Sequence, residues 1–200
     1  MIDVDEVQAD GRRARRQRGR SAVLDAMVDL VREGHSPPST EAVAERAGVS
    51  VASLFRYFPS VEELQQETTA RFFQRYSSLF DVPDVGMGSL DGRIGRYVST
   101  RLTLYETIGP VARFARAQSF ERPHLATNLI QLRRRHADAT RRHFAEELRD
   151  LAPAARDDRV VVITSITSFE SWELLRHDLE RSHTQIQRAW TWSIRSLCSR

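Results

Sequence analysis

Residues 40–58, TEAVAERAGVSVASLFRYF, decide the fold of the N-terminal part of this sequence. Gly48 stands between two short segments of helical spacing, where a sharp turn suits a left-handed backbone conformation. Ser50 can cap the second segment, because its hydroxyl oxygen can accept a backbone N–H one turn on. Apolar side chains that can hold two helices at a steep angle lie around the turn: Val43, Ala47, Val49 and Leu54. This arrangement predicts a helix-turn-helix.

The second helix of this motif has residues suited to the major groove of B-DNA, where the N-terminal part of such a helix meets the base edges. Arg56 can pair with guanine, Tyr57 can donate a hydrogen bond to a phosphate, and hydroxyls at the helix starts can lie beside phosphate oxygens. We expect this helix to present its first residues and one side to solvent. The expected DNA contacts are Thr40, Ser50, Val51, Ala52, Ser53, Phe55, Arg56 and Tyr57.

A block of arginines precedes the motif. Residues 11–20, GRRARRQRGR, contain six arginines and no acidic residue. Such a run is usually a solvated arm, and often one that binds nucleic acid. We predict that residues 1–15 form a basic, disordered arm and that the arginines of the block contact DNA: Arg12, Arg13, Arg15, Arg16, Arg18 and Arg20.

The rest of the sequence predicts an all-α fold. Only two prolines and no glycine follow Pro110, so residues 124–152 and 154–200 contain no helix breaker. Apolar residues in these stretches recur at steps of three and four, as on one face of a helix. Residues 60–63 and 182–185 have the form of a capping box, which predicts two further helix starts.

A junction between two domains is expected at residues 81–95, DVPDVGMGSLDGRIG, because one proline and four glycines interrupt the helical pattern there. We therefore place a helix-turn-helix domain at residues 16–76, with its motif at residues 39–58. A larger helical domain is placed at residues 83–200.

The composition of the 200-residue chain excludes several classes of protein. Hydrophobic residues make up 40%, which is close to the content of globular proteins and unlike that of disordered ones. No apolar run approaches the roughly 18 residues of a membrane span, and the N-terminus lacks the apolar core of a secretory signal. Cys198, the single cysteine, provides neither an internal disulfide nor a cysteine-based metal cluster. We expect a cytoplasmic protein that does not associate with membranes.

The N-terminal residues resemble the TetR family of bacterial transcriptional regulators. The matching segments are residues 21–26, 34–35, 40, 44–50, 54–58 and 60–64. The chain departs from the family at Val51 and Val61, where lysine is common, and at Phe55, where tyrosine is usual. The resemblance implies a homodimer whose N-terminal three-helix units bind a palindromic operator in double-stranded DNA. We expect this regulator to act as a repressor.

The resemblance also implies a C-terminal helical bundle that encloses a pocket for a small-molecule effector and dimerises through its last two helices. Effector binding would then release the operator. Candidate pocket residues, a mostly apolar set with a few polar groups, are Tyr105, Glu106, Arg113, Phe114, Phe120, Leu129, Ile166, Phe169 and Glu170. The aromatic members can equally be core residues, and the charged members can simply pair with other charged side chains.

Apolar residues at helical spacing near the C-terminus are the candidates for the dimer interface: Trp172, Leu175, Leu179, Ile186, Trp190, Ile194 and Leu197. The same residues are open to a second interpretation, as the core of a single chain. Both interpretations fit a repeated apolar face on a helix.

Other functions receive less support from the sequence. The chain has no glycine-rich phosphate loop and no Gly-x-Ser-x-Gly nucleophile elbow, so we expect neither an enzyme nor a bound cofactor. His136 and His143 lie two turns apart, but without further ligands this spacing does not indicate a metal site. The alternative function is that of a helical small-molecule-binding or interaction protein that binds no operator.

Overall fold

The computed structural model describes residues 4–35 and 37–199, and the side-chain surroundings of residues 11, 13–35 and 37–199. Within this part of the chain the regular elements are helices and no strand occurs, as the sequence predicts. The chain divides into two compact units between Ser77 and Ser78. Among the described helices, none combines the length and the apolar character that crossing a membrane requires.

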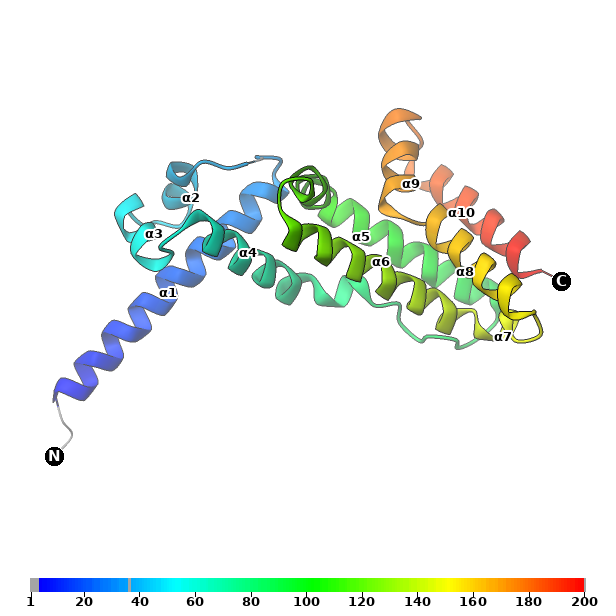
Figure 1. Ribbon diagram of the computed structural model, residues 1–200, viewed down its shortest axis with the longest axis horizontal. Helices are drawn as coiled ribbons and strands as arrows, with labels where there is room; N and C mark the ends of the chain where they lie inside the picture. The colour runs from blue at the N-terminus through cyan, green and yellow to red at the C-terminus, as the bar shows by residue number, and fades with distance from the viewer. Residues whose placement is uncertain (1–3, 36, 200) are drawn as a thin grey trace. The chain divides into compact units, whose positions relative to one another are not determined.

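The first unit consists of four helices, α1 (Val4–Arg32), α2 (Thr40–Arg46), α3 (Val51–Tyr57) and α4 (Val61–Tyr76) (Figure 1). Helix α1 packs against each of the other three, and α2 packs against α3. Their shared core is apolar and includes Val23, Met27, Leu30, Val43, Leu54, Phe58 and Leu64. Burial of these side chains provides the main driving force that holds the short helices α2 and α3 in place.

Helix α1 extends through residues for which we expected a disordered arm. Residues 4–15 form its first turns, and Figure 1 shows this end of α1 projecting past the other helices of the unit. Arginine, alanine and glutamine have high helix propensity, and the two glycines in the block are too few to interrupt the helix. The arginines are therefore carried on a helix.

The turn between α2 and α3 has the geometry that the sequence predicts. Gly48 has a φ of 66°, in the left-handed region. Its N–H donates to the Glu45 carbonyl, and the N–H of Val49 donates to the Ala44 carbonyl, each at 3.0 Å. These two bonds close the end of α2 and let the chain reverse into α3.

A row of ion pairs joins α1 to α4. Asp25 receives two hydrogen bonds of 2.8 Å from the Arg71 guanidinium, and these bonds hold the pKa of the Asp25 carboxyl below its usual range. Asp29 pairs with Arg75 at 2.9 Å one turn further along. The partly exposed pairs contribute modestly to stability but fix the register of the two helices.

The second unit is built on two long helices, α5 (Leu90–Ser119) and α6 (Pro123–His143), which pack against each other. The short helix α7 (Ala145–Leu148) leads to α8 (Pro153–Ile166), α9 (Phe169–Glu173) and α10 (His183–Cys198). A 3-10 turn (Ser77–Phe80) and a π-helical turn (Leu174–Asp178) complete the described elements. Helix α5 contacts α9 and α10, while α8 lies against α6 and α10.

Helix starts in this unit follow from local sequence. Ser182 and Gln185 form a complete capping box at the start of α10, as the sequence predicts. Helix α8 ends at Ile166, with Thr167 as its C-cap, and Ser168 caps the start of α9 by accepting the N–H of Ser171 at 3.1 Å.

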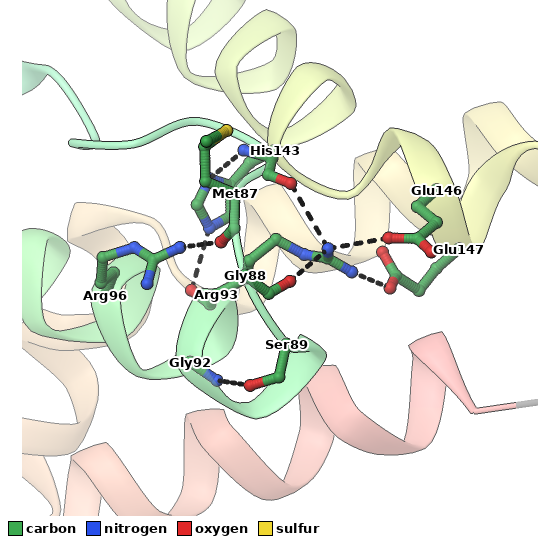
Figure 2. Close-up of polar contacts among 10 residues, drawn as sticks. Met87, Gly88, Ser89, Gly92, Arg93, Arg96, His143, Glu146 and Glu147 are labelled. Carbon is green, nitrogen blue, oxygen red and sulfur yellow. Dashed lines mark hydrogen bonds and ion pairs between the residues drawn. The ribbon is translucent and has the colours of Figure 1, made fainter.

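Arg93 fastens the segment before α5 to the α6–α7 corner (Figure 2). Its guanidinium is buried and donates to the Gly88 carbonyl and to Glu146, each at 2.9 Å, and also to Glu147. The His143 ring spans the same segment, because its Nε2–H donates to the Arg93 carbonyl at 2.9 Å and its Nδ1 accepts the N–H of Gly86. Burial lowers the pKa of His143, which favours this neutral tautomer.

Candidate functional site

Helix α3 has one buried side and one exposed side. Leu54 and Tyr57 face the core, and Val51 packs partly against it, so positions spaced by three residues point inward. Ala52 and Arg56 are exposed, and Phe55 keeps 43% of its surface accessible. The exposed phenyl ring and the exposed guanidinium are adjacent in α3, and both groups are suited to base edges.

The exposed side of α3 is organised by hydrogen bonds between its own side chains. Ser50 caps the helix by accepting the N–H of Ser53 at 3.1 Å, and its hydroxyl donates to the Ser53 hydroxyl at 3.0 Å. Arg56 then donates to the same Ser53 oxygen at 2.9 Å. These consecutive hydrogen bonds hold the Arg56 guanidinium along the exposed side of α3, toward the N-terminal end of the helix.

Tyr57 does not lie where we expected it. The sequence analysis expects α3 to present it to solvent, but only 9% of its surface is exposed and it belongs to the core. The reason is its position three residues after Leu54, on the inward side of the helix.

Arg20 also differs from its predicted place. Its Nε donates to Glu67 at 3.1 Å, another of its nitrogens donates to the Tyr57 carbonyl, and its guanidinium lies 4.7 Å from the centre of the Phe58 ring. This arginine therefore ties α1 to α3 and α4, rather than standing free for DNA.

The remaining arginines of the block are differently placed. Arg13, Arg15, Arg16 and Arg18 are exposed on α1. The side chain of Arg12 lies outside the described residues. Arg13 and Arg16 precede Arg20 by seven and four positions, so they share its side of the helix.

The helix starts of the motif use serines. Ser39, which the sequence analysis did not select, caps α2 by accepting the N–H of Ala42 at 3.2 Å. Thr40 is instead the first residue of α2. Serine directly before a helical run is itself a capping signal, so residue 39 was recognisable from the sequence.

The apolar pocket candidates of the second unit divide into three groups. Tyr105 and Phe169 are buried and pack edge to face, with their ring centres 5.7 Å apart, and Leu129 is a buried residue of α6. Phe114 and Ile166 are half-buried. Phe120 is 93% exposed, because it follows the last residue of α5, and it therefore lines no pocket.

The charged pocket candidates pair with other charged or polar side chains. Arg113 donates to Glu173 at 2.6 Å, and Glu106 lies 2.7 Å from the His183 ring nitrogen. Glu170 accepts hydrogen bonds from Arg116 at 3.0 Å and from Arg133 at 2.7 Å. Although partial burial raises the pKa of Glu170, these two arginines hold it at about 2. These residues therefore pair with neighbouring side chains, which is the alternative to a pocket role that the sequence analysis left open.

The interface candidates mostly form the core of a single chain. Trp172, Ile186, Trp190 and Ile194 are buried within the unit. Leu175 and Leu197 are half-buried, and only Leu179 is largely exposed, at 52%. Helix α10 turns its apolar stripe toward α5 and α8, so that stripe is unavailable to a second chain.

Other apolar residues on α8 and α10 are exposed. Trp192 has 70% of its surface accessible, Val161 60% and Val162 41%. The sequence analysis missed them because it followed the stripe of Trp190, and a residue two positions along a helix points to another side.

Comparison with known proteins agrees with this geometry. Residues 26–68 match the family model described as bacterial regulatory proteins, tetR family. An HTH-type transcriptional repressor, KstR of Rhodococcus jostii (strain RHA1), is 39% identical over 75 residues, which are 37% of this chain and 34% of that protein. KstR of Mycolicibacterium smegmatis (strain ATCC 700084 / mc(2)155) is 34% identical over 82 residues, 40% of this chain and 38% of that protein. The chain thus spans only about a third of the length of these curated relatives.

A solved structure extends the likeness to the second unit. The crystal structure from Rhodococcus sp., described as a TetR-family transcriptional regulator, matches 90% of this chain and 99% of its own with a TM-score of 0.63. Its sequence identity is 19%, so this match shows a common fold. Residues 26–68 thus resemble the helix-turn-helix region of the TetR family of bacterial regulatory proteins. The chain as a whole shares the fold of a solved TetR-family regulator.

Proposed function

We propose that this chain is a DNA-binding transcriptional repressor that acts as a dimer on a palindromic operator and is released by a small-molecule effector. The observation that carries the proposal is the exposed side of α3, where Phe55 and Arg56 stand on a short helix whose other side is fixed in the core. The curated relatives of this region are named as transcriptional repressors rather than enzymes.

The exposed side of α3 supplies the base contacts in this proposal. Arg56 pairs with guanine, and Phe55 contacts a thymine methyl group in place of the tyrosine that the family often has. Ala52 is exposed near the start of the helix and allows close approach to a base. The arginines on the projecting part of α1 bind phosphates and supply affinity that does not depend on sequence.

A dimer would form through the exposed apolar residues of α8 and α10. Val161, Val162 and Trp192 replace the predicted interface residues, four of which are buried in the core. A two-fold pairing of this surface would present two copies of α3 to two half-sites. An effector that prefers an arrangement of the dimer unable to bind DNA would weaken DNA binding. Bound DNA would weaken effector binding by the same factor.

A binding measurement tests this function. The full chain is titrated, by fluorescence anisotropy, into a labelled duplex from the region upstream of its own gene and into a shuffled duplex of equal composition. We expect the natural duplex to bind at least about 1,000-fold more tightly. Equal affinity for the two duplexes would leave the alternative, a helical small-molecule-binding or interaction protein that binds no operator.

A further inference from the structure

Arg101 is a fully buried arginine in the middle of α5, with 0% of its surface exposed. Its two terminal nitrogens are both buried, and neither hydrogen-bonds to any described residue. None of the ion pairs among the described residues includes it. A guanidinium stays charged at any pH that proteins tolerate, so this is a buried positive charge without a carboxylate partner.

Arg93 provides an internal comparison, because it lies on the same helix and is equally buried, at 2% exposure. Its terminal nitrogens donate to backbone carbonyls and to the carboxylates of Glu146 and Glu147 (Figure 2). This is how a structural arginine is accommodated in a protein interior. Arg101, about two turns further along α5, has no such set of acceptors.

The residues around Arg101 do not neutralise its charge. Its guanidinium lies 5.0 Å from the centre of the Tyr97 ring, a favourable but weak contact. The Tyr97 hydroxyl is already hydrogen-bonded to the Thr140 hydroxyl, at 2.6 Å. His136 is also buried, its Nε2 has no hydrogen-bond partner, and burial together with the charge of Arg101 lowers its pKa to about 2. The imidazole is therefore neutral and can donate without adding a second charge.

Next to this position lies a cluster of aromatic rings. Tyr105, one turn after Arg101, contacts Phe169, Trp172 and Trp190, with ring centres 5.7 to 6.4 Å apart. The indole nitrogens of both tryptophans are buried and have no acceptor. This region thus combines apolar surface with hydrogen-bond donors that the protein itself does not satisfy.

We propose that Arg101 anchors the carboxylate of the effector, and that the aromatic cluster around Tyr105 contacts its apolar body. The proposal rests on the effector-responsive function proposed above and names the chemical class of the effector. A carboxylate can accept two parallel N–H bonds from one guanidinium. It carries one negative charge, which the single positive charge of Arg101 balances, whereas a phosphate dianion would leave a buried negative charge.

Partly exposed ion pairs lie beside the aromatic cluster and give the ligand a way in. The Arg116 guanidinium lies 4.1 Å from the centre of the Phe169 ring and bonds to Glu170, which also bonds to Arg133. These contacts join α5, α6 and α9. Exposed ion pairs of this kind contribute little stability, so they can open when a ligand enters.

The stability of the protein without ligand gives the first test. The buried charge of Arg101 has no counter-ion when no carboxylate is bound, so it should destabilise the free protein. Replacing the charge by an apolar side chain of similar length, Arg101→Met, should raise Tm by at least about 2 °C, whereas Arg93→Met should lower it. Circular dichroism on the full chain measures both variants. A fall in Tm for Arg101→Met similar to that for Arg93→Met would mean that Arg101 is a structural residue, and the proposal would be wrong.

Ligand binding gives the second test, performed without DNA. Calorimetry compares decanoate with decanol and phenylbutanoate with phenylbutanol, so each pair differs in the carboxylate alone. The unmodified chain should bind each carboxylate at least about tenfold more tightly than its alcohol, and Arg101→Met should lose this preference. Arg134→Met, which removes an exposed arginine of α6, should keep it.

The two proposals fail in different ways. Equal binding of carboxylate and alcohol, or binding of neither, overturns the role of Arg101 even if the natural duplex is bound specifically. If the chain prefers carboxylates through Arg101 but binds no duplex specifically, the proposed role of Arg101 stands and the proposed repressor function is wrong.

Discussion

Gly19 of α1 lies directly against the ring of Tyr57 at the end of α3. A methyl group added at Gly19 would stand 2.6 Å from the Tyr57 phenol oxygen and 2.9 Å from two ring carbons. The missing side chain of Gly19 is thus what lets α3 approach α1. The same contact helps to hold Tyr57 in the core. It also sets the position of α3, whose exposed side we propose to contact bases.

We expect Gly19→Ala to destabilise the first unit by about 1–3 kcal/mol, because the buried ring cannot move away without disturbing α3. Gly11→Ala is the matched control, since a methyl group there meets nothing within 4 Å. It should stabilise the helix by about 0.5–1 kcal/mol. Urea unfolding followed by circular dichroism measures both. Equal effects of the two substitutions would show that the contact with Tyr57 does not constrain α3.

Arg56→Ala should reduce discrimination between operator variants at one base pair of each half-site, by about 1–3 kcal/mol. The physical reason is the removal of a bidentate guanidinium contact held in place by Ser53. Arg32→Ala removes an exposed arginine from the end of α1 and should leave discrimination unchanged. Competition binding with single-base variants of the operator is the measurement. A uniform loss of affinity for all duplexes would instead assign Arg56 to a phosphate.

The exposed arginines of α1 should account for part of the salt dependence of DNA binding. Replacing Arg13, Arg15, Arg16 and Arg18 by glutamine should flatten the plot of log K against log salt by about 0.9 for each phosphate that is no longer neutralised. Arg20→Gln should act differently, since Arg20 bonds to Glu67 and its removal lowers stability rather than the slope. Titrations at several salt concentrations separate the two effects, and an unchanged slope for the fourfold variant would exclude α1 from the interface.

Stability should fall as pH decreases below about 6.5, the ordinary pKa of histidine. Burial lowers the pKa of both His136 and His143 in the folded chain. At a pH between the folded-state and the unfolded-state pKa of each histidine, only the unfolded chain therefore takes up the proton. Stability is therefore fully present above the unfolded pKa and is lost on acidification. Unfolding free energies from pH 7.5 to about 5 measure this slope. His143→Gln should reduce it, whereas His35→Gln, at an exposed position, should not.

Trp192→Glu should convert a dimer into a monomer, because it places a charge in the proposed apolar interface. Phe120→Glu offers a matched control, as it changes an even more exposed aromatic residue, 93% against 70%, at the end of α5. Light scattering after size-exclusion chromatography distinguishes the two states. A dimer that persists in Trp192→Glu and dissociates in Phe120→Glu would place the interface at the C-terminal end of α5 instead.

Elements that depend on near neighbours could be predicted from the amino-acid sequence alone. The left-handed turn at Gly48, the serine cap at residue 50 and the capping box at Ser182 each involve residues within about one helical turn, so their signals are local. The recognisable helix-turn-helix and the all-α class follow from such signals added along the chain.

Which of several similar residues face inward depends instead on packing between distant segments. Arg20 has the same local surroundings as the other arginines of its block, and contacts with distant residues such as Glu67, 47 positions away, set it apart. Trp190 and Trp192 are equally apolar, yet only the first packs into the unit. Arg101 carries no sequence signal at all, because its burial depends on how α5 packs within the second unit. Such pairings arise from the whole fold, which local residue patterns do not encode.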